Sequence, residues 1–153
     1  MSRVRFGSKV VVVGLVALSV LATSHRAQAD VKLPKVIGSH MVLQQKIPLP
    51  IWGTADAGEE VTVSIGDNSA STKAGADGKW SVKLQEMSAG GPHEVLVKGK
   101  NELKLTDVLI GEVWVASGQS NMEMSVSNSA NPQEEIAAAK YPNIRLFHVK
   151  KIP

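Results

Sequence analysis

The chain has 153 residues, with 17 basic and 14 acidic side chains, a formal charge of +3 and no cysteine. The lack of cysteine excludes a thiol nucleophile and a thiolate metal site. Residues 1–29 hold four of the basic residues and no acidic one, so residues 30–153 carry a charge of −1. Residues 30–153 therefore lack the basic balance typical of nucleic-acid binding.

The first 29 residues have the layout of a secretory signal peptide. Basic residues before position 10 precede an apolar run over residues 10–22, and Ala27-Gln28-Ala29 forms a small-residue cleavage signal. A membrane span needs roughly 20 apolar residues, so this run is too short for one. We expect export to the periplasm or the medium, and no membrane span in the mature chain. An uncleaved anchor is the less favoured alternative.

Residues 30–106 are predicted to form an all-β, sandwich-like domain. Short runs rich in Val, Ile, Leu and Thr alternate with turn signals at the spacing typical of such a fold. In the run 80–84, Trp80, Val82 and Leu84 share one face. Asp77-Gly78 is the strongest hairpin signal, because a type I′ turn needs positive φ at both central positions. The expected strands are 31–37, 41–43, 49–53, 61–65, 80–84, 94–97 and 103–105.

The pattern changes at Asp107. Residues 108–116 are almost continuously apolar, which is typical of a parallel strand buried on both faces. Asn131 and Pro132 then predict the N-cap and first position of a helix, and residues 143–147 predict another strand. Strand, loop, helix and strand indicate the beginning of an α/β domain in residues 107–153, which we expect to be truncated at the end of this chain.

One short segment carries a candidate for covalent chemistry. Gly118-Gln119-Ser120-Asn121-Met122 follows the predicted buried strand, at the sheet edge where α/β proteins place their sites. Ser120 would present its hydroxyl there as a nucleophile, and its backbone N–H would face a developing oxyanion. The spacing alone also fits an ordinary polar loop, because the second glycine of the G-x-S-x-G motif is absent.

Residues 111–124 resemble the first conserved block of the sialate O-acetylesterase family, a branch of the SGNH hydrolases. Upstream segments at 41–44, 52–53, 77–80 and 89–92 match as well, so the resemblance covers residues 31–150. It implies a flavodoxin-like α/β catalytic domain after a β-rich domain. It also implies removal of O-acetyl groups from sugars, with no metal and no cofactor.

The resemblance also implies roles for individual residues. Ser120 matches the family nucleophile, and its backbone N–H, with Gln119 and Asn121 beside it, would contribute to oxyanion or substrate binding. The catalytic Asp and His of a D-x-x-H block are expected beyond Pro153. The 153-residue chain alone is therefore expected to be inactive or nearly so.

Other side chains favour structural roles. No Asp stands three residues before His40, His93 or His148, which speaks against a catalytic base among them. The tryptophans at 52, 80 and 114 are expected in the core rather than stacked on a sugar. No cluster of His and carboxylates has metal-ligand spacing.

The predicted function is that of a serine carboxylic-ester hydrolase acting on an acetylated sugar or glycan. Two alternatives remain open at this point. One keeps the chemistry but acts on acetylated xylan or another polysaccharide, and the other is a non-enzymatic carbohydrate-binding β-sandwich.

Overall fold

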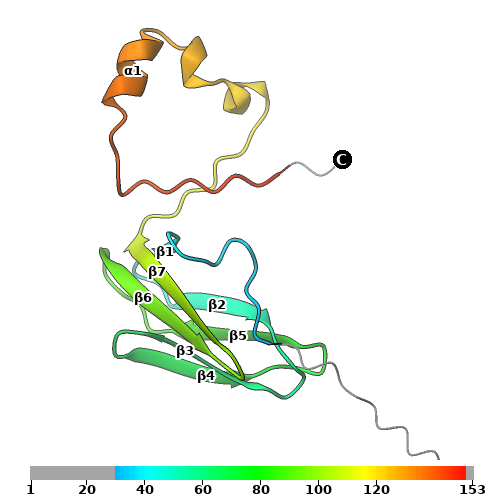
Figure 1. The fold of residues 1–153 in the computed structure, drawn as a ribbon. Helices are drawn as coiled ribbons and strands as arrows, with labels where there is room; N and C mark the ends of the chain where they lie inside the picture. Colours follow the sequence, from blue (N-terminus) through cyan, green and yellow to red (C-terminus); the bar gives the residue numbers. More distant parts are fainter. Residues whose placement is uncertain (1–29, 151–153) are drawn as a thin grey trace, which may run out of the picture.

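The computed structural model describes residues 30–150, and Figure 1 shows a β-rich part followed by a segment with little regular structure. The predicted signal peptide, residues 1–29, lies outside the described residues. The β-rich part contains seven strands. They are β1 (Val42–Gln44), β2 (Leu49–Thr54), β3 (Glu60–Ile65), β4 (Asn68–Lys73), β5 (Lys79–Leu84), β6 (Gly90–Lys98) and β7 (Glu102–Gly111).

The strands form two sheets. The larger sheet has the order β1-β7-β6-β3-β4, and β2 and β5 form a separate antiparallel pair. Within the larger sheet only β1 and β7 run parallel, with Leu43 opposite Ile110. The sequential hairpin of β3 and β4 turns at Gly66-Asp67, where Gly66 has a φ of 56° that glycine adopts without a steric penalty.

One apolar core lies between the two sheets. Its members come from alternate positions of the strands, as the period of two in a strand requires. In β5 the side chains of Trp80, Val82 and Leu84 are all buried, which confirms the face predicted from the sequence. The most deeply buried large side chains are Leu49, Ile51, Ile65, Leu84, Val31, Val61, Val63, Val95, Val97 and Val108. The prediction of a β-rich domain is thus confirmed.

Three local expectations in this part were wrong. Residues 31–37 contribute one isolated bridge, Lys32 with Thr54, instead of a strand. Strand β4 was missed, since its sequence is small and polar throughout. Asp77-Gly78 does not close a hairpin, because β4 pairs with β3 while β5 pairs with β2.

The predicted strand over residues 108–116 also differs from the structure. Residues up to Gly111 belong to β7, which pairs antiparallel with β6 on both sides of Asp107, with a shift of register at that point. The following residues form no strand, and Trp114 and Val115 are 86% and 93% exposed. No strand among residues 30–150 pairs with residues 112–116, so their backbone N–H and C=O groups make no hydrogen bonds within a sheet. The start of an α/β domain is therefore not confirmed, and the domain division stays a prediction.

The rest of the segment contains short helices. They are η1 (Ser120–Glu123), η2 (Val126–Asn128) and α1 (Pro132–Ala138). The predicted helix after Asn131 is confirmed, with Pro132 at its start. Asn131 itself adopts a left-handed conformation, and its side chain makes no capping hydrogen bond. The strand predicted over 143–147 is absent, and none of the helices in residues 30–150 is long and apolar enough to cross a membrane.

Candidate functional site

Ser120 is the first residue of η1, directly after the turn at Gly118. The amide of Met122 donates to the carbonyl of Gln119 at 2.9 Å, which closes the first turn. A Cβ added at Gly118 would lie 2.5 Å from Met122 Cγ, so a side chain at this position would force Met122 to shift. Gly118 therefore allows η1 to lie close to the preceding backbone.

The Ser120 side chain is exposed, and within residues 30–150 its hydroxyl forms no hydrogen bond. The amides of Ser120 and Asn121 stand at the start of η1, where a helix leaves its first N–H groups without a helical acceptor. Gln119 precedes them in an extended conformation. A hydroxyl and two amides thus lie together on an accessible turn, but no base contacts the hydroxyl within the described part of the chain.

The three histidines among residues 30–150 lie elsewhere. His40 Nδ1 is 2.7 Å from Asp107 Oδ2, and His93 lies on β6 opposite Val108. His148 is exposed near the end of the described residues. In residues 30–150 no hydrogen bond joins any of them to Ser120.

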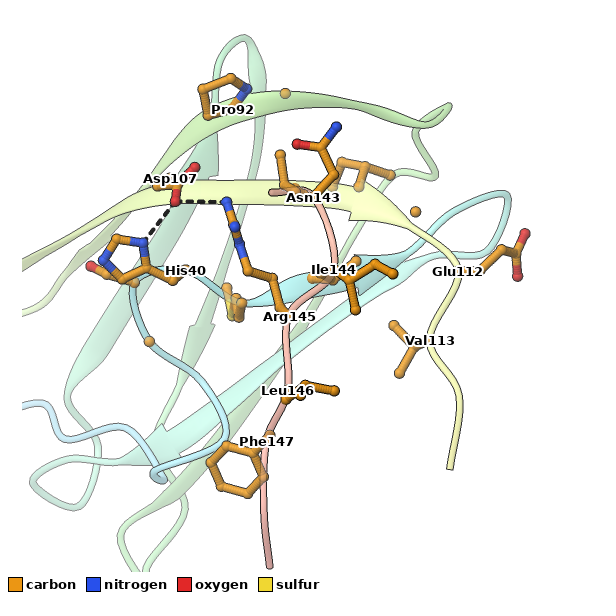
Figure 2. Close-up of a pocket in the computed structure, with 18 of the residues that line it drawn as sticks. His40, Pro92, Asp107, Glu112, Val113, Asn143, Ile144, Arg145, Leu146 and Phe147 are labelled. Carbon is orange, nitrogen blue, oxygen red and sulfur yellow. Dashed lines mark hydrogen bonds and ion pairs between the residues drawn. The ribbon is translucent and has the colours of Figure 1, made fainter. Parts of the chain in front are cut away.

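A groove of about 950 Å³ lies between the β-rich part and the segment that follows it (Figure 2). Ser120 is not among the residues that line this groove. Its walls come from the loop before β1, the start of β6, the end of β7 and residues 143–147. The lining residues fall in the ranges 35–42, 89–92, 107–116 and 143–147.

A polar cluster sits on the wall of this groove. Asp107 accepts hydrogen bonds from His40 and from Arg145 Nη2, the latter at 2.8 Å (Figure 2). The His40 hydrogen bond, and then the positive charge of Arg145, hold the pKa of Asp107 below its ordinary value. Arg145 also donates to the Pro142 carbonyl, while its Nε is buried without a partner in the described residues.

A second polar contact fixes the exit from β7. Glu112 accepts hydrogen bonds from the side-chain amides of Gln44 and Gln45, at 3.0 and 2.6 Å, and these bonds lower its pKa. The Gln44 carbonyl oxygen accepts from the Val113 amide at 2.8 Å. These hydrogen bonds fix the direction in which the chain leaves β7.

Sequence reasoning missed the cluster of His40, Asp107 and Arg145. Its members are separated by 67 and 38 residues, and no motif links them. Only the fold brings them together. Among residues 30–150 no group of three His, Asp or Glu side chains could hold a metal ion.

The tryptophans divide into two kinds. Trp80 is 3% exposed and belongs to the core, as expected. Trp52 is 42% exposed and Trp114 is 86% exposed, so the expectation of core positions was wrong for both.

Comparison with known proteins identifies relatives of this chain. No protein-family model matches the chain. Sialate O-acetylesterase of Rattus norvegicus is 36% identical over 151 residues, which cover 90% of this chain and 28% of that protein. The Homo sapiens protein of the same name is 35% identical over 155 residues, covering 92% of this chain and 29% of that one.

A solved structure agrees with these relatives. The crystal structure of a carbohydrate acetylesterase from Xanthomonas citri has a TM-score of 0.69 and 38% identity, covering 72% of this chain and 26% of that chain. The chain spans less than a third of the length of the curated relatives it matches. The predicted resemblance is therefore confirmed: over this segment the chain is a relative of the sialate O-acetylesterases.

Proposed function

We propose that this chain is part of a carbohydrate O-acetylesterase that hydrolyses O-acetyl esters of sugars through Ser120. The observation that carries the proposal is the 34–36% identity to sialate O-acetylesterases over about nine-tenths of the chain. The Xanthomonas citri neighbour, a carbohydrate acetylesterase, supports the same substrate class. The exposed turn at Gly118 and Ser120 is compatible with a nucleophile that must reach an ester.

The proposed reaction begins with attack of Ser120 Oγ on the acetyl carbonyl carbon. A base takes the hydroxyl proton, and the carbonyl oxygen becomes an oxyanion that the amides of Ser120 and Asn121 would stabilise. Collapse of this intermediate breaks the bond to the sugar oxygen, which takes the proton from the base and leaves as a hydroxyl, and an acetyl-serine remains. Water then attacks the acetyl group, releasing acetate and regenerating Ser120.

The base would come from residues outside the described part of the chain. Within residues 30–150 the Ser120 hydroxyl has no histidine partner, and a serine without a base is a weak nucleophile. Removal of a triad member still leaves roughly 10³–10⁴-fold acceleration over water in enzymes of this type. We therefore expect the 153-residue chain alone to hydrolyse p-nitrophenyl acetate orders of magnitude more slowly than an esterase with a complete triad.

We propose a domain order and a cellular location for this enzyme as well. Residues from Asp107 onwards would begin the α/β domain of an SGNH hydrolase, with the β-rich domain in front of it. Residues 1–29 would direct export to the periplasm or the medium and then be removed. The substrate would thus be an acetylated sugar or glycan outside the cytoplasm.

Labelling by a fluorophosphonate probe tests the nucleophile directly. In the protein as its gene encodes it, the probe should label one serine, and Ser120→Ala should abolish labelling and lower kcat by about 10³-fold or more. Ser127→Ala is the matched control, because Ser127 is an exposed serine seven residues away whose hydroxyl bonds Ser125. Full labelling of Ser120→Ala would refute the assignment.

The substrate can be assigned with the same protein. Acetate release from O-acetylated sialic acid is compared with release from acetylated xylan at equal acetyl concentration. A higher kcat/KM for the sialic acid favours a sialate esterase, and the reverse favours a polysaccharide esterase. Release from neither would sink the carbohydrate esterase proposal.

A further inference from the structure

The outer face of the β2–β5 sheet presents an exposed tryptophan. Along β2 the side chains alternate, so Leu49 and Ile51 face the core while Trp52 points outward and is 42% exposed. β5 has the same alternation, with Trp80 inward and Ser81 outward, directly across from Trp52. Trp52 therefore lies on the solvent-facing surface of this sheet.

Lysines surround this tryptophan. The register places Lys79 opposite Thr54 and Lys83 opposite Pro50, so the two lysines flank Trp52 diagonally from the neighbouring strand. Lys79 and Lys83 are four positions apart on β5, which corresponds to about 14 Å along the strand. Lys32 extends the same face through its bridge to Thr54. The side chains of Lys32, Trp52, Lys79, Ser81 and Lys83 are here called the Trp52 face.

The charge on this face is only partly neutralised. Lys79 forms an ion pair with Asp77 at 3.4 Å, and both side chains are largely exposed. Within residues 30–150, neither Lys32 nor Lys83 has an ion pair. Two ammonium groups thus remain available on either side of the indole.

Within residues 30–150, Trp52 does not belong to the apolar core. The core beneath it is filled by the opposite faces of β2 and β5, and Trp52 makes no hydrogen bond or ring contact with any described residue. An exposed indole offers a broad apolar surface with one N–H donor, a combination that is enriched where proteins bind partners. The ammonium groups around it favour an anionic partner.

From this combination we infer that the Trp52 face binds an acidic sugar chain. The C–H face of a pyranose ring packs on the indole, and carboxylates on the neighbouring sugar units meet Lys83 and Lys32. Ser81, directly opposite Trp52, supplies a hydroxyl at the same level of the sheet. The site would hold a polymeric or cell-surface glycan on the β-rich part of the protein.

This site is separate from Ser120. In Figure 1, β2 and β5 lie in the lower part of the molecule, whereas the helices that follow β7 lie at the top. None of the five residues of the Trp52 face lines the groove at Asp107. Binding at this face does not depend on the esterase proposal, and either one can fail without the other.

The test is titration calorimetry of the 153-residue chain with an oligogalacturonate, and with a neutral xylo-oligosaccharide of equal length. We expect the acidic sugar to bind more tightly. Trp52→Ala should weaken that binding by about tenfold or more, and Trp52→Phe should restore part of it. Lys83→Gln and Lys32→Gln should each weaken it a few-fold, an effect that about 1 M salt removes.

Matched controls separate this site from other exposed groups. Trp114→Ala removes a more exposed tryptophan, Lys73→Gln removes an exposed strand lysine of the other sheet, and Ser120→Ala removes the proposed nucleophile. All three should bind the oligogalacturonate like the wild type. Circular dichroism and sedimentation of Trp52→Ala confirm an intact fold and an unchanged oligomeric state.

Four outcomes would overturn the inference, three of them seen in the binding measurements. Those three are no binding of either sugar at millimolar concentration, an unchanged affinity in Trp52→Ala, or equal affinity for the two sugars with no effect of the lysine variants. A Trp52→Ala variant that loses self-association instead of sugar binding would also overturn it, because a second copy would then occupy the face.

Discussion

Arg145 donates a hydrogen bond to Asp107 at 2.8 Å, joining residues 38 positions apart in the sequence. Asp107 lies within β7 but has a φ of 54°, a left-handed conformation that aspartate and asparagine tolerate better than most residues. His40 approaches the same carboxylate oxygen from the loop before β1. One carboxylate thus connects three separate parts of the chain.

Removing the charge at Asp107 should release the segment around Arg145. We expect Asp107→Asn, which keeps the backbone preference, to raise hydrogen–deuterium exchange over residues 141–150 several-fold. The midpoint of urea unfolding should move little, because this partly buried pair, with side chains 26% and 34% exposed, lies outside the apolar core. Unchanged exchange in this segment would show that the ion pair does not hold it.

The same contact predicts a pH dependence. The pKa of Asp107 is lower in the folded chain than its ordinary value of 3.8. The ionised Asp107 carboxylate therefore contributes its full stabilisation above pH 3.8, and this stabilisation is lost as the pH falls through the lowered pKa. Exchange over residues 141–150 should rise in this acid range in the wild type, beyond the intrinsic pH dependence measured in Asp107→Asn.

Glu59 should contribute to stability through two backbone hydrogen bonds. It is 8% exposed, and its carboxylate accepts from the amides of Asp56 and Lys100 at 3.0 and 2.7 Å. Glu59→Gln replaces one acceptor oxygen by an NH₂ group, which leaves a backbone N–H without a partner. We expect a loss of about 1–3 kcal/mol in the free energy of unfolding by urea.

A neighbouring substitution controls for the loss of charge alone. Glu60 is exposed at the start of β3, so Glu60→Gln should change the free energy of unfolding by less than about 0.5 kcal/mol. Equal effects of the two substitutions would mean that the backbone bonds of Glu59 do not matter.

Gly53 is required by the packing of Trp80. A Cβ at position 53 would lie 2.1 Å from the Lys32 carbonyl oxygen and 2.9 Å from the Trp80 ring. We expect Gly53→Ala to destabilise the chain by about 1–3 kcal/mol or more, as overpacking does. Gly38→Ala is the control, since a Cβ added at Gly38 would meet nothing within 4 Å. Thermal or urea unfolding of both variants tests the difference.

Much of the β-rich part could be predicted because its strands are amphipathic. β3 and β5 alternate apolar and polar residues, and that period identifies both the strand and its buried face. β4 carries no such pattern, because it is an edge strand that faces solvent along much of its length. The parallel pairing of β1 with β7 depends on contacts between distant residues, which no local pattern encodes.

The region of the candidate site could be predicted less well. Residues 113–116 are apolar enough for a buried strand, but burial needs neighbours, and none of the strands in residues 30–150 lies beside them. Ser120 could be singled out from its motif and from the family resemblance. Its role as nucleophile stays a prediction, because no described group activates its hydroxyl.

The absence of a side chain at Gly118 should matter for the proposed chemistry at Ser120. Because a Cβ at position 118 would meet Met122 Cγ at 2.5 Å, Gly118→Ala should push η1 away and displace Ser120. In the protein as its gene encodes it, we expect fluorophosphonate labelling of Ser120 to slow by about tenfold or more, since small displacements of reacting groups are costly. Adding Met122→Ala shortens the side chain that causes the clash, so the double variant should recover much of the labelling rate. Met122→Ala alone is the control and should label nearly as fast as the wild type. If Gly118→Ala labels at the wild-type rate, the position of η1 does not limit the reactivity of Ser120; if the double variant fails to recover, another property of Gly118 is responsible.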